Sequence, residues 1–173
     1  YINANFVKGP SDKTYICTQA PMESTTSDFW QMVWEQNSQV IVMLCQLKEN
    51  QAEKSFLYWP DQLNQVSHFG EYQLRLVDFV TSGNLQHRVL ELSLGGVGRR
   101  IYHLQYLGWP DHSTPHCAQE FYDLVRVTSE LEAMTKPCGP LVVHCSAGVG
   151  RAGTFLTLYE YFAQLKVGNK SIR

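Results

Sequence analysis

The 173-residue chain has no apolar run that approaches the roughly 20 residues needed for a membrane-spanning helix. It also lacks a Gly/Ser/Pro-rich linker, a low-complexity tract and an internal repeat. The composition, 44% hydrophobic and 17% charged, is that of an ordinary globular protein and not of a disordered one. We therefore expect a single domain over residues 1–173, with no membrane contact from this segment itself.

Net charge and cysteine pairs are also scarce. The formal charge of −2 argues against general nucleic-acid binding, which needs a basic surface, although a local basic pocket for an anion is compatible with it. The five cysteines are an odd number at scattered positions, without a Cys-x-x-Cys pair and without a signal peptide: Cys17, Cys45, Cys117, Cys138 and Cys145. This usage argues against a disulfide framework or a zinc site, and reduced thiols in the cytoplasm fit it best.

The two ends of the sequence suggest a fragment. The chain begins at Tyr1 without an initiator methionine, and Ser171–Arg173 contains no signal that would end a helix. We interpret it as a piece truncated at both ends.

Apolar patterns predict an α/β protein, α+β in detail, with a central mixed and highly twisted sheet flanked by helices. Strand-like patterns occur in six segments: residues 15–19, 39–45, 72–80, 87–94, 100–107 and 141–144. The third to fifth alternate and are joined by turn residues, which predicts an antiparallel meander. Helical spacing occurs in three segments: one capped by Thr25, Thr26, Ser27 or Asp28 and carrying Phe29, Trp30, Val33 and Trp34 toward a core, one over 118–134, and one through 155–162.

The segment between the strand at 141–144 and the last helix carries the chemistry. It reads HCSAGVGRAG, residues 144–153, and such a strand–loop–helix junction points backbone N–H groups and a helix N-terminus at one anion-sized hollow. Gly148, Gly150 and Gly153 remove side chains where the backbone must bend sharply or approach a ligand.

Within this loop, Cys145 and Arg151 are the candidate reactive residues. Cys145 would lie at the bottom of the hollow, where positive surroundings favour the nucleophilic thiolate. Arg151 can hold two phosphate oxygens through its planar guanidinium, with a grip that strengthens in the transition state. Nothing in this scheme needs a metal or a cofactor. The alternative is a cysteine buried for packing, which is common at strand ends.

The string 144–151 resembles the signature loop of the classical protein tyrosine phosphatases. Further segments resemble that family in the same order and extend the likeness over essentially the whole chain: Tyr1–Asn5, Thr18–Pro21, Asp28–Trp30, Tyr58–Pro60 and Trp109–His112. The shorter Cys-x5-Arg pattern alone would also fit dual-specificity and lipid phosphatases, which generally lack the Tyr-Trp-Pro and aromatic helix segments.

The resemblance implies hydrolysis of phosphotyrosine in proteins through a phosphocysteine intermediate, in a pocket too deep for phosphoserine. Its partners would be phosphotyrosine-containing proteins. The implied substrate-binding residues are Asp111, Cys145, Ser146, Ala147, Gly148, Val149, Gly150 and Arg151. Asp111 would be the general acid on a closing loop at 109–115, although Pro-Asp alone is a common turn. Trp109 would anchor the hinge of that loop, or pack in the core, or both.

Four supporting residues also follow from the resemblance. Glu49 would orient Arg151, and Lys54 would meet Asp111, whereas charges on a loop are otherwise mostly solvated. Tyr58 and His144 would hydrogen-bond beside the nucleophile, and the competing interpretation of His144 is a satisfied core histidine.

The sequence departs from the family at two positions within the matched motifs. Ala152 stands where the family has Ser or Thr, whose hydroxyl supports the thiolate, so we expect slower hydrolysis of the phosphoenzyme. Gln19-Ala20-Pro21 replaces Gln-Gly-Pro. The family's substrate-stacking loop and its water-positioning loop would precede Tyr1 and follow Arg173.

The sequence leaves two questions open, whether the domain is catalytically active and where in the cell the parent protein lies. Ala152 leaves open a pseudophosphatase that binds phosphotyrosine without hydrolysing it. The parent would be either a cytoplasmic enzyme or a membrane receptor with this part inside the cell.

Overall fold

The computed structural model describes residues 1–168, which form ten strands, three α-helices and one 3-10 turn. In chain order these are β1 (Ala4–Lys8), β2 (Thr14–Gln19), the turn η1 (Glu23–Thr25), α1 (Thr26–Glu35), β3 (Val40–Met43), β4 (Lys48–Glu49), β5 (Ala52–Glu53), β6 (Val66–Phe69), β7 (Tyr72–Ser82), β8 (Leu85–Leu94), β9 (Val97–Tyr106), α2 (Ala118–Met134), β10 (Leu141–Cys145) and α3 (Arg151–Gly168).

Eight strands form one mixed sheet in the order β1-β2-β10-β3-β9-β8-β7-β6. The central strands β2, β10, β3 and β9 run parallel to one another, and the pairings on both flanks are antiparallel. All residues of β3 and β10 are buried, because helices cover both faces of this part of the sheet and such strands read as continuous apolar runs. The carboxyl ends of β3 and β10 therefore meet at one edge, where the 144–153 loop begins.

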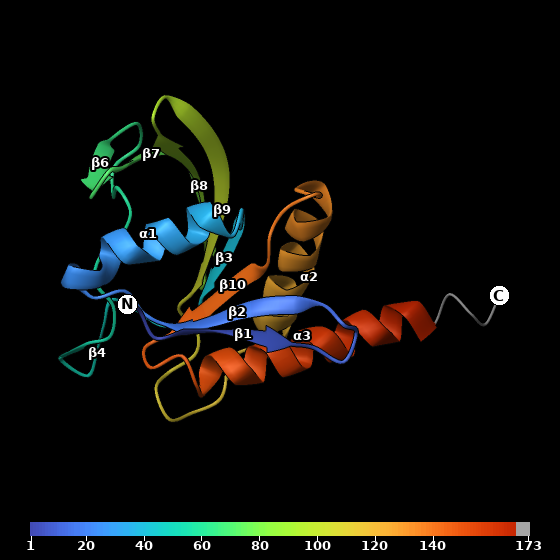
Figure 1. The fold of residues 1–173 in the computed structure, drawn as a ribbon. Helices are drawn as coiled ribbons and strands as arrows, with labels where there is room; N and C mark the ends of the chain where they lie inside the picture. The colour runs from blue at the N-terminus through green and yellow to red at the C-terminus, as the bar shows by residue number, and fades with distance from the viewer. Residues whose placement is uncertain (169–173) are drawn as a thin grey trace.

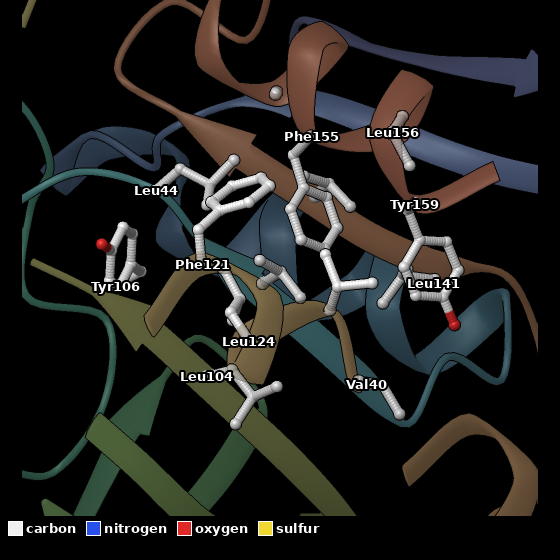
Figure 2. Close-up of a cluster of buried hydrophobic side chains, with 14 of the residues drawn as sticks. Val40, Leu44, Leu104, Tyr106, Phe121, Leu124, Leu141, Phe155, Leu156 and Tyr159 are labelled. Carbon is white, nitrogen blue, oxygen red and sulfur yellow. The ribbon is translucent and has the colours of Figure 1, made fainter. Parts of the chain in front are cut away.

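Helices α2 and α3 cover one face of the sheet and α1 covers the other (Figure 1). On the first face, Phe121 and Leu124 of α2 pack with Phe155 and Tyr159 of α3 against the central strands (Figure 2). This core fixes the start of α3, and with it the position of Arg151, relative to the end of β10.

The structure confirms the α/β class, the mixed sheet and the predicted meander, which is β7, β8 and β9. Strands β1 and β6 and the β4–β5 hairpin were not predicted. β1 and β6 are the two edges of the sheet, and four of the five residues of β1 are exposed, so its sequence carries no alternation.

One expectation about the start of α1 is wrong in detail. The Thr25 hydroxyl does not cap the helix; it accepts from the Met22 N–H at 3.0 Å and closes the preceding turn η1. Trp34 is half-buried and packs against the core between α1 and the sheet, as its spacing predicts, and its ring lies beneath the Arg99 guanidinium at 3.7 Å. The expectation about Ser171–Arg173 lies outside the described residues.

Candidate active site

The 144–153 loop is held at its entry by the strands on both sides of β10. The Leu44 N–H donates to the His144 carbonyl at 2.8 Å, and the Ala20 N–H donates to the Ser146 carbonyl at 2.9 Å. The loop then runs over residues 146–150 and passes into α3 at Arg151. The polypeptide therefore turns from a buried strand into a helix within five residues, the geometry that gathers N–H groups around an anion.

Gly148 is the loop glycine that the conformation requires. Its φ is +77°, and an added Cβ would lie 2.5 Å from the Thr18 carbonyl. The Cys17 thiol, also on β2, lies 3.0 Å from the Gly148 carbonyl, which accepts its hydrogen. Gly150 and Gly153 have no positive φ, and an added Cβ at either would meet nothing within 4 Å. The predicted need for glycine at a sharp bend therefore applies to Gly148 alone of these three.

A cavity of about 450 Å³ opens at this loop. Its lining includes all the predicted substrate-binding residues except Gly148: Asp111, Cys145, Ser146, Ala147, Val149, Gly150 and Arg151. Lys54, Trp109, His112, Ser113 and Thr154 complete the lining. Cys145 is only 4% exposed, so a reacting group must enter the cavity to reach its sulfur.

Arg151 is held by a bidentate contact with Glu49. Its Nη1 donates to Glu49 Oε1 at 2.7 Å and its Nη2 donates to Oε2 at 3.1 Å, and both side chains are 8% exposed. Nη1 also donates to the Trp109 carbonyl at 2.9 Å. Burial opposes the charge, but the Glu49 hydrogen bonds and carboxylate outweigh it and raise the pKa of Arg151. The structure thus joins Arg151 to Glu49, and the orienting role of Glu49 stays a prediction.

Asp111 reaches the cavity from the 109–115 loop and pairs with Lys54. Lys54 Nζ donates to Asp111 Oδ2 at 2.6 Å, while His112 and Arg151 lie 3.8 and 3.7 Å from the same carboxylate. The Lys54 hydrogen bond is the main cause that lowers the pKa of Asp111. Burial acts in the opposite direction, and the nearby charges of His112, Lys54 and Arg151 lower the pKa further. The same hydrogen bond raises the pKa of Lys54. In this state Asp111 is a carboxylate.

Trp109 fixes the start of the 109–115 loop. Its indole N–H donates to the Ser113 carbonyl at 2.9 Å, and its ring packs edge-on against Phe121 with 5.4 Å between centroids. The His116 N–H donates to the Gly108 carbonyl at 2.8 Å and ties the two ends of the loop together. Trp109 packs in the core as expected, and its role as a hinge stays a prediction.

Tyr58 and His144 are in hydrogen-bond contact beside Cys145. Tyr58 Oη lies 2.6 Å from His144 Nε2, and both side chains are fully buried. Burial lowers the pKa of His144 to about 4, against a weaker effect of the Cys145 carbonyl, so the ring is neutral at pH 7.

A third member of this cluster, His103 on β9, was missed in the sequence. Its Nε2 lies 2.8 Å from the same Tyr58 Oη. The available signal was the alternation of β9, which places His103 and Gln105 on the same face as the buried Ile101. Two polar residues at core positions of a strand indicate a buried polar network.

Among residues 1–168, no group of three or more His, Cys, Asp and Glu side chains could hold a metal ion. In the same part of the chain, no helix is both long enough and apolar enough to cross a membrane.

Comparison with known proteins identifies the family. The family model described as "Protein-tyrosine phosphatase" matches residues 1–172. The chain belongs to the protein-tyrosine phosphatase family. Its members are hydrolases, and two of the segments that resemble the family in the sequence, 109–112 and 144–151, line the cavity.

Relatives include both receptor-type and non-receptor enzymes. Tyrosine-protein phosphatase 2 of Dictyostelium discoideum is 41% identical over 167 residues, 95% of this chain and 42% of the relative. Receptor-type tyrosine-protein phosphatase R of Homo sapiens is 41% identical over 168 residues, 96% of this chain and 25% of the relative. Tyrosine-protein phosphatase non-receptor type 7 of Homo sapiens is 40% identical, over 96% of this chain and 46% of the relative. The chain thus spans less than half the length of each of these three phosphatases.

Proposed function

We propose that this protein hydrolyses phosphotyrosine in proteins through a phosphocysteine intermediate on Cys145. The observation that carries the proposal is the single cavity that brings together Cys145, Arg151 and Asp111 from β10, α3 and the 109–115 loop. A nucleophile, an anion clamp and a proton donor are the three parts that transfer of a phosphoryl group to a thiolate requires.

The reaction has two displacement steps at phosphorus. In the first, the Cys145 thiolate forms the S–P bond, the bond from phosphorus to the tyrosyl oxygen breaks, and Asp111 protonates that oxygen. In the second, water attacks the phosphocysteine and gives its proton to the Asp111 carboxylate. The S–P bond then breaks, releasing inorganic phosphate and restoring the thiolate. Arg151 and the loop N–H groups bind the phosphoryl oxygens in both steps.

The ion pair of Asp111 with Lys54 sets a condition on the first step. A carboxylate cannot donate a proton, and the cations around Asp111 favour the carboxylate in the free protein. A bound phosphate brings negative charge close to Asp111, and this raises the pKa of the carboxyl group in the complex. The substrate itself would thus prepare its general acid.

The supporting residues act on these groups. Glu49 would hold Arg151 in register, Trp109 would anchor the loop that carries Asp111, and Tyr58 with His144 would brace the backbone of Cys145. Since Cys145 must remain a reduced thiol, we place the protein in the cytoplasm, alone or as the inner part of a receptor. Its partners would be proteins that carry phosphotyrosine.

The test is hydrolysis of a phosphotyrosyl peptide, with EDTA present, by the purified protein and its Cys145→Ser and Asp111→Ala variants. We expect turnover that is lost in Cys145→Ser and greatly slowed in Asp111→Ala. The chain also has a feature that favours weak catalysis, since the fully buried Ala152 offers no hydroxyl near the thiolate. Binding of the peptide without turnover by the folded protein would identify a phosphotyrosine-binding pseudophosphatase instead.

A further inference from the structure

A line of buried polar side chains leads away from the nucleophile across the sheet. Tyr58 Oη lies between two imidazole nitrogens, 2.6 Å from His144 Nε2 and 2.8 Å from His103 Nε2. All three side chains are fully buried, so water does not compete for these contacts. A hydroxyl carries one hydrogen, so Tyr58 can donate to only one of the two rings and must accept from the other.

Arg88 determines which way the hydrogen bonds run at the far end of the line. Its Nη1 lies 3.5 Å from His103 Nδ1, and its guanidinium lies over the rings of Trp59 and Phe79, at 4.6 and 5.0 Å from their centroids. Nη1 also donates to Gln105 Oε1 at 3.1 Å. Burial lowers the pKa of Arg88 to about 10, so the side chain is still a cation at pH 7.

Because arginine only donates, His103 Nδ1 must be the acceptor of this contact. The positive charge of Arg88 also disfavours a proton on that nitrogen, because like charges repel. Burial and the neighbouring Arg88 lower the pKa of His103 well below its ordinary value, so the ring is neutral and carries its one hydrogen on Nε2. His103 therefore donates to Tyr58 Oη.

The direction at the near end follows independently. His144 Nδ1 lies 3.3 Å from the Cys145 carbonyl, and a carbonyl oxygen only accepts. The neutral His144 ring therefore carries its hydrogen on Nδ1, and its Nε2 accepts from the Tyr58 hydroxyl. Both ends require the same order, in which each group donates to the next from Arg88 through His103, Tyr58 and His144 to the Cys145 carbonyl.

We propose that His103, oriented by Arg88, is a positioning residue that fixes the tautomer of His144 through Tyr58 and so orients the backbone that carries Cys145. The catalytic part of this inference rests on the proposed function. The tautomer part rests on the contacts alone and predicts opposite tautomers in two neighbouring histidines, Nε2–H in His103 and Nδ1–H in His144.

Nitrogen-15 NMR of the histidine rings in the purified protein tests the tautomers directly. The expected result is a protonated Nδ1 in His144 and a protonated Nε2 in His103. His144 protonated on Nε2, or His103 on Nδ1, would overturn the proposal. This measurement needs no turnover. An inactive protein with the expected tautomers would therefore refute the proposed function and leave the tautomer part of this inference standing.

Three variants test the positioning role. His103→Leu and Tyr58→Phe interrupt the line, and we expect the His144 nitrogen resonances to move toward the average of the two tautomers. We also expect kcat to fall by about five- to tenfold, the effect of about one hydrogen bond, with KM little changed. His103→Gln keeps one donor for Tyr58 and one acceptor for Arg88, so it should restore both readouts.

The control is His87→Leu. His87 lies on the neighbouring strand β8, opposite Leu104 and thus on the other face of the sheet from His103, and its Nε2 is buried without a partner among the described residues. This variant should leave kcat and the His144 resonances as in the parent. A His103→Gln variant as impaired as His103→Leu, or unchanged His144 resonances in both interrupted variants, would show that His103 serves packing alone.

Discussion

The contact between Arg151 and Glu49 offers a quantitative test of the site. Glu49→Gln keeps the size of the side chain but replaces one carboxylate oxygen with an amide that cannot accept from Arg151. One of the two hydrogen bonds, at 2.7 and 3.1 Å, is then lost. Because both side chains are 8% exposed, solvent screening is small. A hydrogen bond to a charged group contributes about 1.5–3 kcal/mol. If Arg151 needs this contact to hold the transition state, kcat/KM should fall about 10- to 150-fold, at about 1.4 kcal/mol per tenfold.

The assay is kcat/KM on a phosphotyrosyl peptide, together with calorimetric binding of inorganic phosphate and a thermal unfolding curve to show that the variant is folded. The matched control is Glu53→Gln. Glu53 lies on the neighbouring strand β5, is exposed, and is 3.9 Å from Lys48, so its loss should change kcat/KM by less than about twofold. A folded Glu49→Gln variant with kcat/KM within twofold of the parent would refute the orienting role of Glu49.

Three more predictions follow from the site. Lys54→Met removes the main cause that lowers the pKa of Asp111; because a general acid loses activity as pH rises through its pKa, the basic limb of the kcat/KM profile that reports Asp111 should move to higher pH. A limb that stays in place would argue against this pairing. Gly148→Ala should destabilise the fold in urea by at least the roughly 1–2 kcal/mol that a left-handed conformation costs an L-residue, whereas Gly153→Ala, in a helix with open space, should not; equal effects would contradict the assignment. Ala152→Ser should raise kcat by speeding hydrolysis of the phosphocysteine and reduce any burst of tyrosine release, and an unchanged rate-limiting step would count against the hydroxyl.

The parts of the fold that could be predicted are those whose signals are local. Residues 39–45 and 141–144 are apolar without interruption, and the structure places both in the buried centre of the sheet. The 144–153 loop could be interpreted because the candidate nucleophile, the glycine turn and the arginine lie within one short segment.

The parts that were missed depend on pairing over long distances. β1 is recognisable only because it adds to the edge of β2, since its own residues are mostly exposed. His103 reaches Tyr58 because the sheet order sets β9 beside β3, a register that no local pattern encodes. The close approach of Gly148 to Thr18 likewise requires β2 to be the neighbour of β10. Of these features, only His103 leaves a sign in the sequence, a polar side chain at a strand position that should be apolar.

The contacts of Arg151 explain why loop residues far apart in the chain should act as one site. Arginine has five N–H donors. In the structure both hydrogens of Nη1 are used, by Glu49 and the Trp109 carbonyl, and one of Nη2 is used by Glu49. Among residues 1–168, the Nε–H and the second Nη2–H make no hydrogen bond to a protein acceptor, and these two lie along one edge of the guanidinium. That edge matches two oxygens of a phosphate. Glu49 and Trp109 thus occupy the end of the guanidinium, whereas on its side the Asp111 carboxylate stays 3.7 Å from Nη2, beyond hydrogen-bond distance, and an anion can bind there. Displacing either Glu49 or Trp109 should therefore weaken phosphate binding through Arg151 even though neither need touch the phosphate.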